Sequence, residues 1–169
     1  QKNFSELLNS YSLFQKKLKE NNIDNKYYLL ILGSGEDLKS LKKIKLSKNI
    51  NNLKFLGYQE NPFNILKNAN LYISTSLWED PGHTLIEASA LNVPIITRKC
   101  PSGPFEFYDK TNAVTYNSYN SKELSECIYN FFNLNEEQNV VTRQRIINSK
   151  KLSQKFTKQK YYEDLKKYL

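Results

Sequence analysis

Short apolar runs alternate with segments of helical periodicity along most of the chain, and this pattern limits the possible fold more than any other feature. The runs have the length of β-strands and span residues 27–32, 53–56, 71–74, 93–97 and 112–116. Strands that alternate with helices indicate βαβ units, and hence a parallel sheet with helices on both faces. The unbroken apolar run from Tyr27 to Leu32 is typical of a strand that is covered on both faces.

The helical segments are recognised by apolar residues three or four positions apart. The first runs from Phe4 to Leu18 and ends at the polar stretch 22–25. The others span residues 38–44, 62–68, 83–91 and 121–132, and one or two more helices are expected between 136 and 169. Ser121 is expected to cap the helix that it begins, because a serine hydroxyl accepts hydrogen bonds from the first turn. The predicted fold class is therefore α/β, with three layers around a mostly parallel sheet.

The composition is that of one folded domain. The 169 residues are 39% hydrophobic, enough to bury a core, and we treat 1–169 as a single domain. No apolar run reaches about 18 residues, and the N-terminus lacks the apolar core of a signal peptide. Because the first element is a helix and no Met occurs, we expect the chain to be part of a longer protein with a strand before it. Cys100 and Cys127 lie far apart, which predicts free thiols in a reducing cytoplasm.

The net charge of +8 comes largely from two basic stretches, residues 39–48 and 143–160. Such charge favours anionic partners: phosphates, acidic lipids or nucleic acid. A solvated helix face is the other interpretation, and the abundance of Lys, Asn, Ile and Tyr also fits a biased genomic composition. The charge alone therefore leaves a nucleic-acid-binding module open.

The densest group of chemically useful residues lies between Trp78 and Ala88. A turn at Pro81-Gly82 precedes a helix, so the N–H groups from Gly82 to Leu85 are expected at a helix N-terminus, where anions bind. Glu79 precedes the turn, and Glu87 lies about one helical turn inside the helix and returns to the same edge. Two carboxylates suit paired sugar hydroxyls. The alternative is that both are cap and surface charges.

Other motifs narrow the chemistry. The loop 99–104 holds Ser102 and Gly103 between two prolines, which stiffen it. Gly33-Ser34-Gly35 lacks the third glycine of a dinucleotide fingerprint, and no P-loop occurs. His83 is the only histidine and no Asp-x-Asp pair exists, so we expect neither a metal nor another cofactor.

Together these residues resemble the donor domain of the family-four retaining glycosyltransferases. The main match is Glu79 and Glu87, separated by seven residues and embedded in the segments 74–82 and 85–97. The loop Cys100-Pro101-Ser102-Gly103-Pro104 is similar to a branch that transfers GalNAc, GlcNAc or related sugars, often from UDP. The resemblance implies the C-terminal half of a GT-B fold, a Rossmann-like sandwich. Asn92 stands where the family usually has Gly, and Asn tolerates the left-handed conformation.

The resemblance also implies a role for each matching residue. Glu79 and Lys2 are the expected catalytic residues: Glu79 would contact donor-sugar hydroxyls, and Lys2 would bind the diphosphate. Glu87 would hold the ribose. The backbone of Gly82 and His83 would face the sugar, that of Thr84 and Leu85 the diphosphate, and Gly57 and Tyr58 the base; Gly33, Ser102 and Gly103 complete the expected donor-binding set.

The expected function follows from these roles. The chain would bind a nucleotide-diphosphate sugar, a UDP-sugar above others, for retaining transfer to a glycan, lipid-linked or lipopolysaccharide acceptor held by a separate N-terminal domain. We expect no metal, no nucleic-acid partner, and a cytoplasmic location that includes peripheral contact with the inner face of the membrane. The isolated chain is expected to be nearly inactive. Two alternatives stay open: a basic nucleic-acid-binding module and a non-catalytic nucleotide-sugar sensor.

Overall fold

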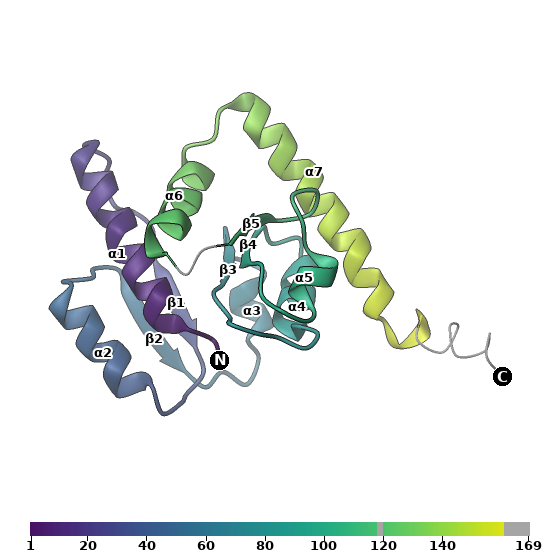
Figure 1. Cartoon of the computed structure of the whole chain (residues 1–169), viewed down its shortest axis with the longest axis horizontal. Coiled ribbons are helices and arrows are strands. Elements are labelled where there is room, and N and C mark those ends of the chain that lie inside the picture. The colour runs from purple at the N-terminus through teal and green to yellow at the C-terminus, as the bar shows by residue number, and fades with distance from the viewer. Residues whose placement is uncertain (118–119, 161–169) are drawn as a thin grey trace.

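A computed structural model describes residues 1–117 and 120–160 (Figure 1). Helices and strands alternate along the chain, as the apolar runs predict. The helices are α1 (Phe4–Glu20), α2 (Leu38–Ser47), α3 (Phe63–Leu66), α4 (His83–Ala90), α5 (Pro104–Phe107), α6 (Ser121–Phe132) and α7 (Glu136–Ser153), followed by the 3₁₀ turn η1 (Gln154–Phe156). The strands are β1 (Leu29–Leu32), β2 (Leu53–Gly57), β3 (Tyr72–Ser74), β4 (Ile95–Arg98) and β5 (Val114–Tyr116).

All strand pairs are parallel, as predicted, but the strands form two sheets. β1 pairs with β2, with Leu29 opposite Leu53. β4 lies between β3 and β5 in the second sheet, with Tyr72 opposite Ile95. Within the described residues no strand ladder joins the two sheets. Because the strands within each sheet are parallel, their carboxyl ends meet at one edge of that sheet, where ligands of such folds bind.

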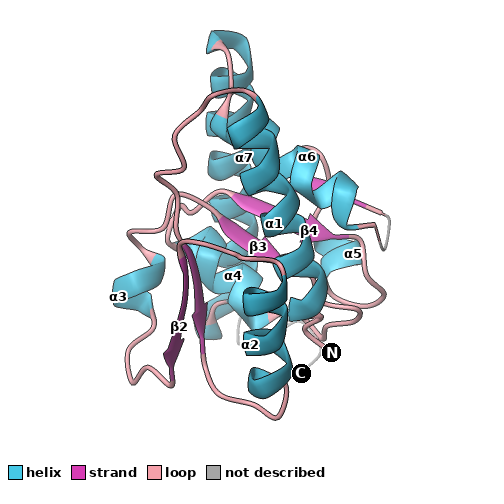
Figure 2. Ribbon diagram, turned by 90° about the vertical axis from the view of Figure 1, so that its left-hand side faces the viewer, coloured by secondary structure: helices cyan, strands magenta, loops and turns pink. Residues whose placement is uncertain are grey.

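Helices cover the two faces of the sheets as separate layers (Figure 2). One apolar cluster joins α1, α2 and α6 to the strands and includes Leu8, Phe14 and Ile96. A second cluster on the other face joins α4, α5 and α7 to them through Leu85, Ile95 and neighbouring residues. Ile95 and Ile96 therefore point to opposite faces of β4, as successive residues of a strand must. This confirms the three-layer α/β architecture.

The two sheets differ in how completely they are covered. All four residues of β4 are buried. β1 was predicted to be covered on both faces, and this is wrong: Ile31 is buried against the α1 side, but Leu30 is 40% exposed. The strand is also shorter than expected, since Tyr27 and Tyr28 precede it. The apolar run shows that a strand forms there, but not that both its faces find partners.

The N-cap of α6 also differs from expectation. α6 is capped by Asn120, whose side chain accepts from the N–H of Lys122, so Ser121 is the first helical residue rather than the cap. α7 begins with a reciprocal capping box between Asn135 and Gln138. The expected C-terminal helical region is thus α7 and η1 as far as it is described; residues 161–169 lie outside the described residues.

The expectations for the two cysteines and for Asn92 agree with the structure. Cys100 is buried, Cys127 is partly buried, and both are free. Asn92 adopts a left-handed conformation with φ 60°, so it replaces glycine at the turn before β4. No helix in the described part of the chain is long and apolar enough to cross a membrane.

Candidate donor site

The N-terminal residues meet the loop after β3 at the carboxyl edge of the second sheet. The N–H of Leu77 donates to the carbonyl of Gln1 at 2.9 Å. The Thr75 hydroxyl donates to the carbonyl of Lys2 at 2.8 Å. These two bonds attach the chain just before α1 to the segment that leads to Glu79.

Lys2 and Glu79, the two residues expected to be catalytic, are in direct contact. The Lys2 Nζ forms an ion pair with Glu79 Oε1. The same oxygen accepts from the Ser76 hydroxyl at 2.6 Å. Glu79 is only 7% exposed, so its carboxylate is oriented by these two donors rather than by water. Sequence reasoning named the two ends of this cluster but missed Ser76 as a site residue.

The turn before α4 has the geometry of an anion-binding N-terminus. Gly82 is the N-cap of α4 and has φ 87°, a left-handed conformation that favours glycine. The Leu85 N–H already donates to the Gly82 carbonyl at 2.9 Å. Within the part of the chain that the structure describes, no hydrogen bond is recorded for the N–H groups of His83 and Thr84. These two donors therefore point from the positive end of the helix dipole.

The second loop packs tightly against this turn. Gly103 has φ 35°, and a Cβ placed on it would come within 2.8 Å of the Pro81 Cα and closer still to the Pro81 carbonyl. Ser102, beside it, also has a left-handed backbone, with φ 64°. Gly103 is thus required for the close approach of the two loops. The loop 99–104 was expected to be rigid, and this contact gives the physical reason.

Glu87 lies on α4 one turn after His83. Burial, with smaller contributions from the Glu79 and Glu87 carboxylates, raises the pKa of the Tyr72 hydroxyl to about 12. Both carboxylates are therefore close enough to Tyr72 to act on it electrostatically. The two glutamates thus share Tyr72 as a neighbour, and their joint role toward a donor stays a prediction.

A cavity of about 360 Å³ lies beside Glu87. His83, Ile86 and Glu87 line one wall, and the segment Phe156–Lys158 lines the other. Phe156 is 36% exposed and meets the Phe107 ring edge-on, with centroids 5.0 Å apart. Sequence reasoning missed this wall, although an exposed aromatic residue after a long helix is a signal that could have indicated it.

The loops after β1 and β2 lie at the carboxyl edge of the first sheet. The Gly33 N–H donates to the Gly57 carbonyl at 2.7 Å, and both glycines have left-handed φ angles. Tyr58 is 78% exposed. The structure thus brings Gly33 and Gly57 together and leaves the Tyr58 ring available at the surface.

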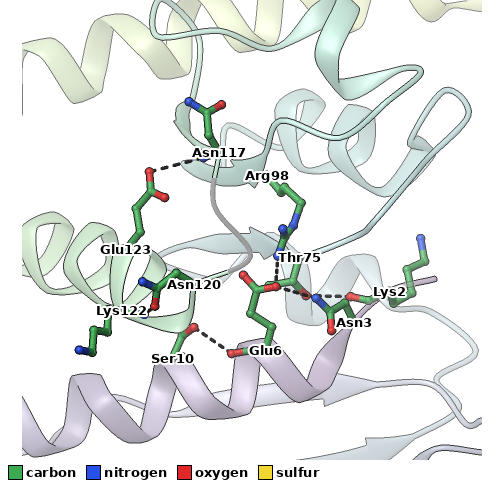
Figure 3. A network of polar contacts seen from close by, with 10 residues as sticks. All are labelled: Lys2, Asn3, Glu6, Ser10, Thr75, Arg98, Asn117, Asn120, Lys122 and Glu123. Atoms are coloured by element: carbon green, nitrogen blue, oxygen red, sulfur yellow. Dashed lines mark hydrogen bonds and ion pairs between the residues drawn. The ribbon is translucent and has the colours of Figure 1, made fainter.

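A buried ion pair lies close to the start of α1, beside Asn3 (Figure 3). Arg98, the last residue of β4, is 1% exposed and pairs with Glu6 of α1, which is 6% exposed. The Arg98 guanidinium also lies 5.3 Å from the centroid of the Tyr116 ring. Sequence reasoning missed this pair; its signal was a charged residue at the end of an apolar strand.

Two further groups bear on the chemistry. Burial raises the pKa of the Cys100 thiol, and the nearby Glu79 carboxylate raises it further, so Cys100 is a poor nucleophile near neutral pH. Among the described residues no group of three or more His, Cys, Asp or Glu side chains gathers at a point where a metal ion could sit.

The family model described as "Glycosyl transferases group 1" matches residues 1–151 of the chain. The chain belongs to this family. Membership agrees with the resemblance found in the sequence, and it does not favour a nucleic-acid-binding module.

Curated relatives carry related descriptions. An uncharacterized glycosyltransferase of Methanocaldococcus jannaschii is 44% identical over 79 residues, which are 46% of this chain and 20% of the relative. The poly(glycerol-phosphate) alpha-glucosyltransferase of Bacillus subtilis is 28% identical over 165 residues, which are 96% of this chain and 23% of the relative. The chain thus spans about a fifth to a quarter of the length of these relatives.

Solved structures show the same fold at low sequence identity. S. aureus TarM, solved with fondaparinux, alpha-GlcNAc-glycerol and UDP, matches with a TM-score of 0.82 and 24% identity over 96% of this chain and 31% of that one. Anabaena HepE, solved with UDP-glucose, matches with a TM-score of 0.77 and 21% identity over 98% of this chain and 45% of that one. The fold is that of the Rossmann-like C-terminal domain of GT-B glycosyltransferases.

Proposed function

We propose that this chain is the donor-binding part of a glycosyltransferase that uses a nucleotide-diphosphate sugar, with UDP-sugars as the preferred class. The observation that carries the proposal is the contact of Lys2 and Ser76 with Glu79, beside the N-terminus of α4. This places a cation, two backbone N–H donors and an oriented carboxylate at one edge. UDP or a UDP-sugar in the structural relatives supports the choice of nucleotide.

Each part of the edge suits one part of the donor. Lys2 and the N–H group of Thr84 stabilise a departing diphosphate electrostatically, without a metal ion, and the backbone of Gly82 and His83 faces the sugar. Glu79 accepts from hydroxyls of the donor sugar, and Glu87 accepts from the ribose. Gly57 and Tyr58 contact the base. Gly33, Ser102 and Gly103 shape the loops that bring these groups together.

The reaction we propose is retaining transfer of a hexosyl or N-acetylhexosaminyl group. A glycan, lipid-linked or lipopolysaccharide acceptor would be held by a second domain, so the isolated chain binds the donor but transfers almost nothing. The loop Cys100–Pro104 supports the N-acetylhexosamine branch through its sequence alone. The location in keeping with such acceptors is the cytoplasm and the inner face of its membrane.

Titration of the protein with UDP, GDP and several UDP-sugars, followed by NMR or calorimetry, tests the proposal. We expect UDP to bind and GDP to bind more weakly. Glu87→Ala should weaken UDP binding about tenfold, since it removes a charged hydrogen-bond acceptor from the ribose. Glu20→Ala is the matched control, because Glu20 is exposed at the end of α1. A folded protein that responds to no nucleotide contradicts the proposal.

A further inference from the structure

The Lys2–Glu79 contact depends on two segments that are far apart in the sequence. Lys2 directly precedes Asn3, the N-cap of α1, while Glu79 lies in the loop that continues β3. The bond from the Thr75 hydroxyl to the Lys2 carbonyl is one link between the two segments. The position of α1 relative to the second sheet therefore decides whether the ammonium reaches the carboxylate.

The buried pair of Glu6 and Arg98 joins α1 to β4, the strand that pairs with β3 (Figure 3). On the α1 side, the Asn3 amide donates to Glu6 Oε2 at 2.6 Å, and the Glu6 N–H donates to the Asn3 carbonyl at 3.1 Å. The residue next to Lys2 is thus tied to Glu6. On the sheet side, Arg98 ends β4, which pairs with β3 up to Ser74, just before Thr75.

Stability alone does not explain a buried ion pair at this position. A buried pair of charges is often no more stabilising than an apolar pair of similar volume, because both charges lose their hydration. Unlike an apolar pair, an ion pair is directional, since charged hydrogen bonds hold donor and acceptor in one geometry. The stack of Arg98 on the Tyr116 ring fixes the guanidinium from a third side.

We propose that Glu6 and Arg98 are positioning residues that hold Lys2 at the diphosphate end of the donor site. The inference rests on the proposed function. Within it, the buried pair controls recognition of the diphosphate through Lys2 and does not itself touch the ligand. Loss of the pair lets the start of α1 shift against β3, so the diphosphate loses Lys2, while the base and ribose keep their contacts.

The test compares UDP with uridine, which lacks the diphosphate. Glu6→Gln keeps the volume of the side chain and removes its charge; we expect the Kd for UDP to rise about tenfold and the Kd for uridine to change less than about twofold. Glu126→Gln is the matched control, because it breaks the ion pair that Lys17 of α1 forms with α6, away from the site. It should change neither Kd.

A double-mutant cycle with Lys2→Ala separates positioning from general loosening of the fold. In the Lys2→Ala background, Glu6→Gln should have little further effect on UDP binding, because the group that it positions is gone. An undiminished effect in that background, or an equal loss of UDP and uridine, overturns the inference.

A second variant covers the case in which Glu6→Gln does not fold. Glu6→Leu combined with Arg98→Met replaces the pair by apolar side chains, a change that buried ion pairs often tolerate. We expect a folded protein with the same selective loss of UDP binding. Unchanged UDP affinity in this variant overturns the positioning role alone, whereas absence of UDP binding by the unsubstituted protein overturns the proposed function and this inference with it.

Discussion

The two ends of the candidate donor edge are built in different ways. At the closed end, formed by Lys2, Ser76, Glu79, Gly82 and Gly103, the polar groups are buried or bonded to one another, and the loops touch. At the open end, formed by Gly33, Gly35, Gly57 and Tyr58, the three glycines have no heavy atom within 4 Å of a would-be Cβ. The closed end is preorganised, whereas on the proposed function the open end would gain its contacts from the ligand.

This difference fits the chemistry of the proposed donor. Stabilising a departing diphosphate requires dipoles and charges that are already oriented, because reorienting them costs free energy during the reaction. Recognition of a flat base by an exposed ring requires less preorganisation, since stacking tolerates some movement. Four substitutions test the contrast between the two ends.

The largest effect is expected from Gly103→Ala at the closed end. The added methyl group would overlap the Pro81 backbone, and alanine disfavours the φ of 35°. We expect a loss of about 3 kcal/mol or more in the free energy of unfolding, because the two loops must separate. Urea denaturation followed by circular dichroism measures it.

Gly35→Ala is the matched change at the open end. Gly35 has no positive φ and no neighbour near its would-be Cβ. Its free energy of unfolding should change by less than about 0.5 kcal/mol. Equal losses in the two alanine variants would show that the closed end is no more tightly packed than the open one.

A smaller effect is expected in the pH dependence of the free energy of unfolding, through Tyr116. Tyr116 is fully buried, and burial raises the pKa of its hydroxyl to about 12. In the unfolded chain a tyrosine ionises near pH 10, so the unfolded state gains stability as the pH rises from about 10 to about 12, while the folded state does not. The free energy of unfolding therefore falls across this window.

Tyr116→Phe removes this contribution. Between pH 8 and pH 11, its free energy of unfolding should fall by about 1 kcal/mol less than that of the unsubstituted protein. Tyr58→Phe is the control, because the Tyr58 side chain is 78% exposed whereas Tyr116 is buried. Parallel declines in all three proteins would contradict the buried, protonated state of Tyr116.

The sequence predicted the residues of the closed end better than the buried contacts between distant segments. Glu79, Glu87 and the Pro81-Gly82 turn are close in sequence, so the start of α4 after that turn could be predicted from the local pattern. Lys2 was placed through its resemblance to a family motif, not through any local pattern. The fold class followed from the alternation of apolar runs with helices, because βαβ units leave few arrangements.

The pattern could not predict contacts between distant segments. Glu6 and Arg98 are 92 positions apart by number, and neither lies in a recognisable motif. The exposure of Leu30 depends on what packs over β1, and hydrophobicity carries no information about that. Asn120 rather than Ser121 caps α6 because the start of a helix depends on the backbone of the residue before it, and both residue types cap well.

The smallest effect on stability, and the clearest separation of the two ends, is expected from Tyr58→Ala. The side chain is 78% exposed, so the free energy of unfolding should change by less than about 0.5 kcal/mol. UDP binding should weaken about threefold to tenfold through loss of contact with the base. Inorganic pyrophosphate, which reaches only the closed end, should bind as before.

Tyr28→Ala is the control, because Tyr28 is 57% exposed and lies before β1, away from the carboxyl edge. If Tyr58→Ala weakened pyrophosphate as much as UDP, the two ends would act as one unit, and the division between a preorganised diphosphate end and a ligand-ordered base end would be wrong.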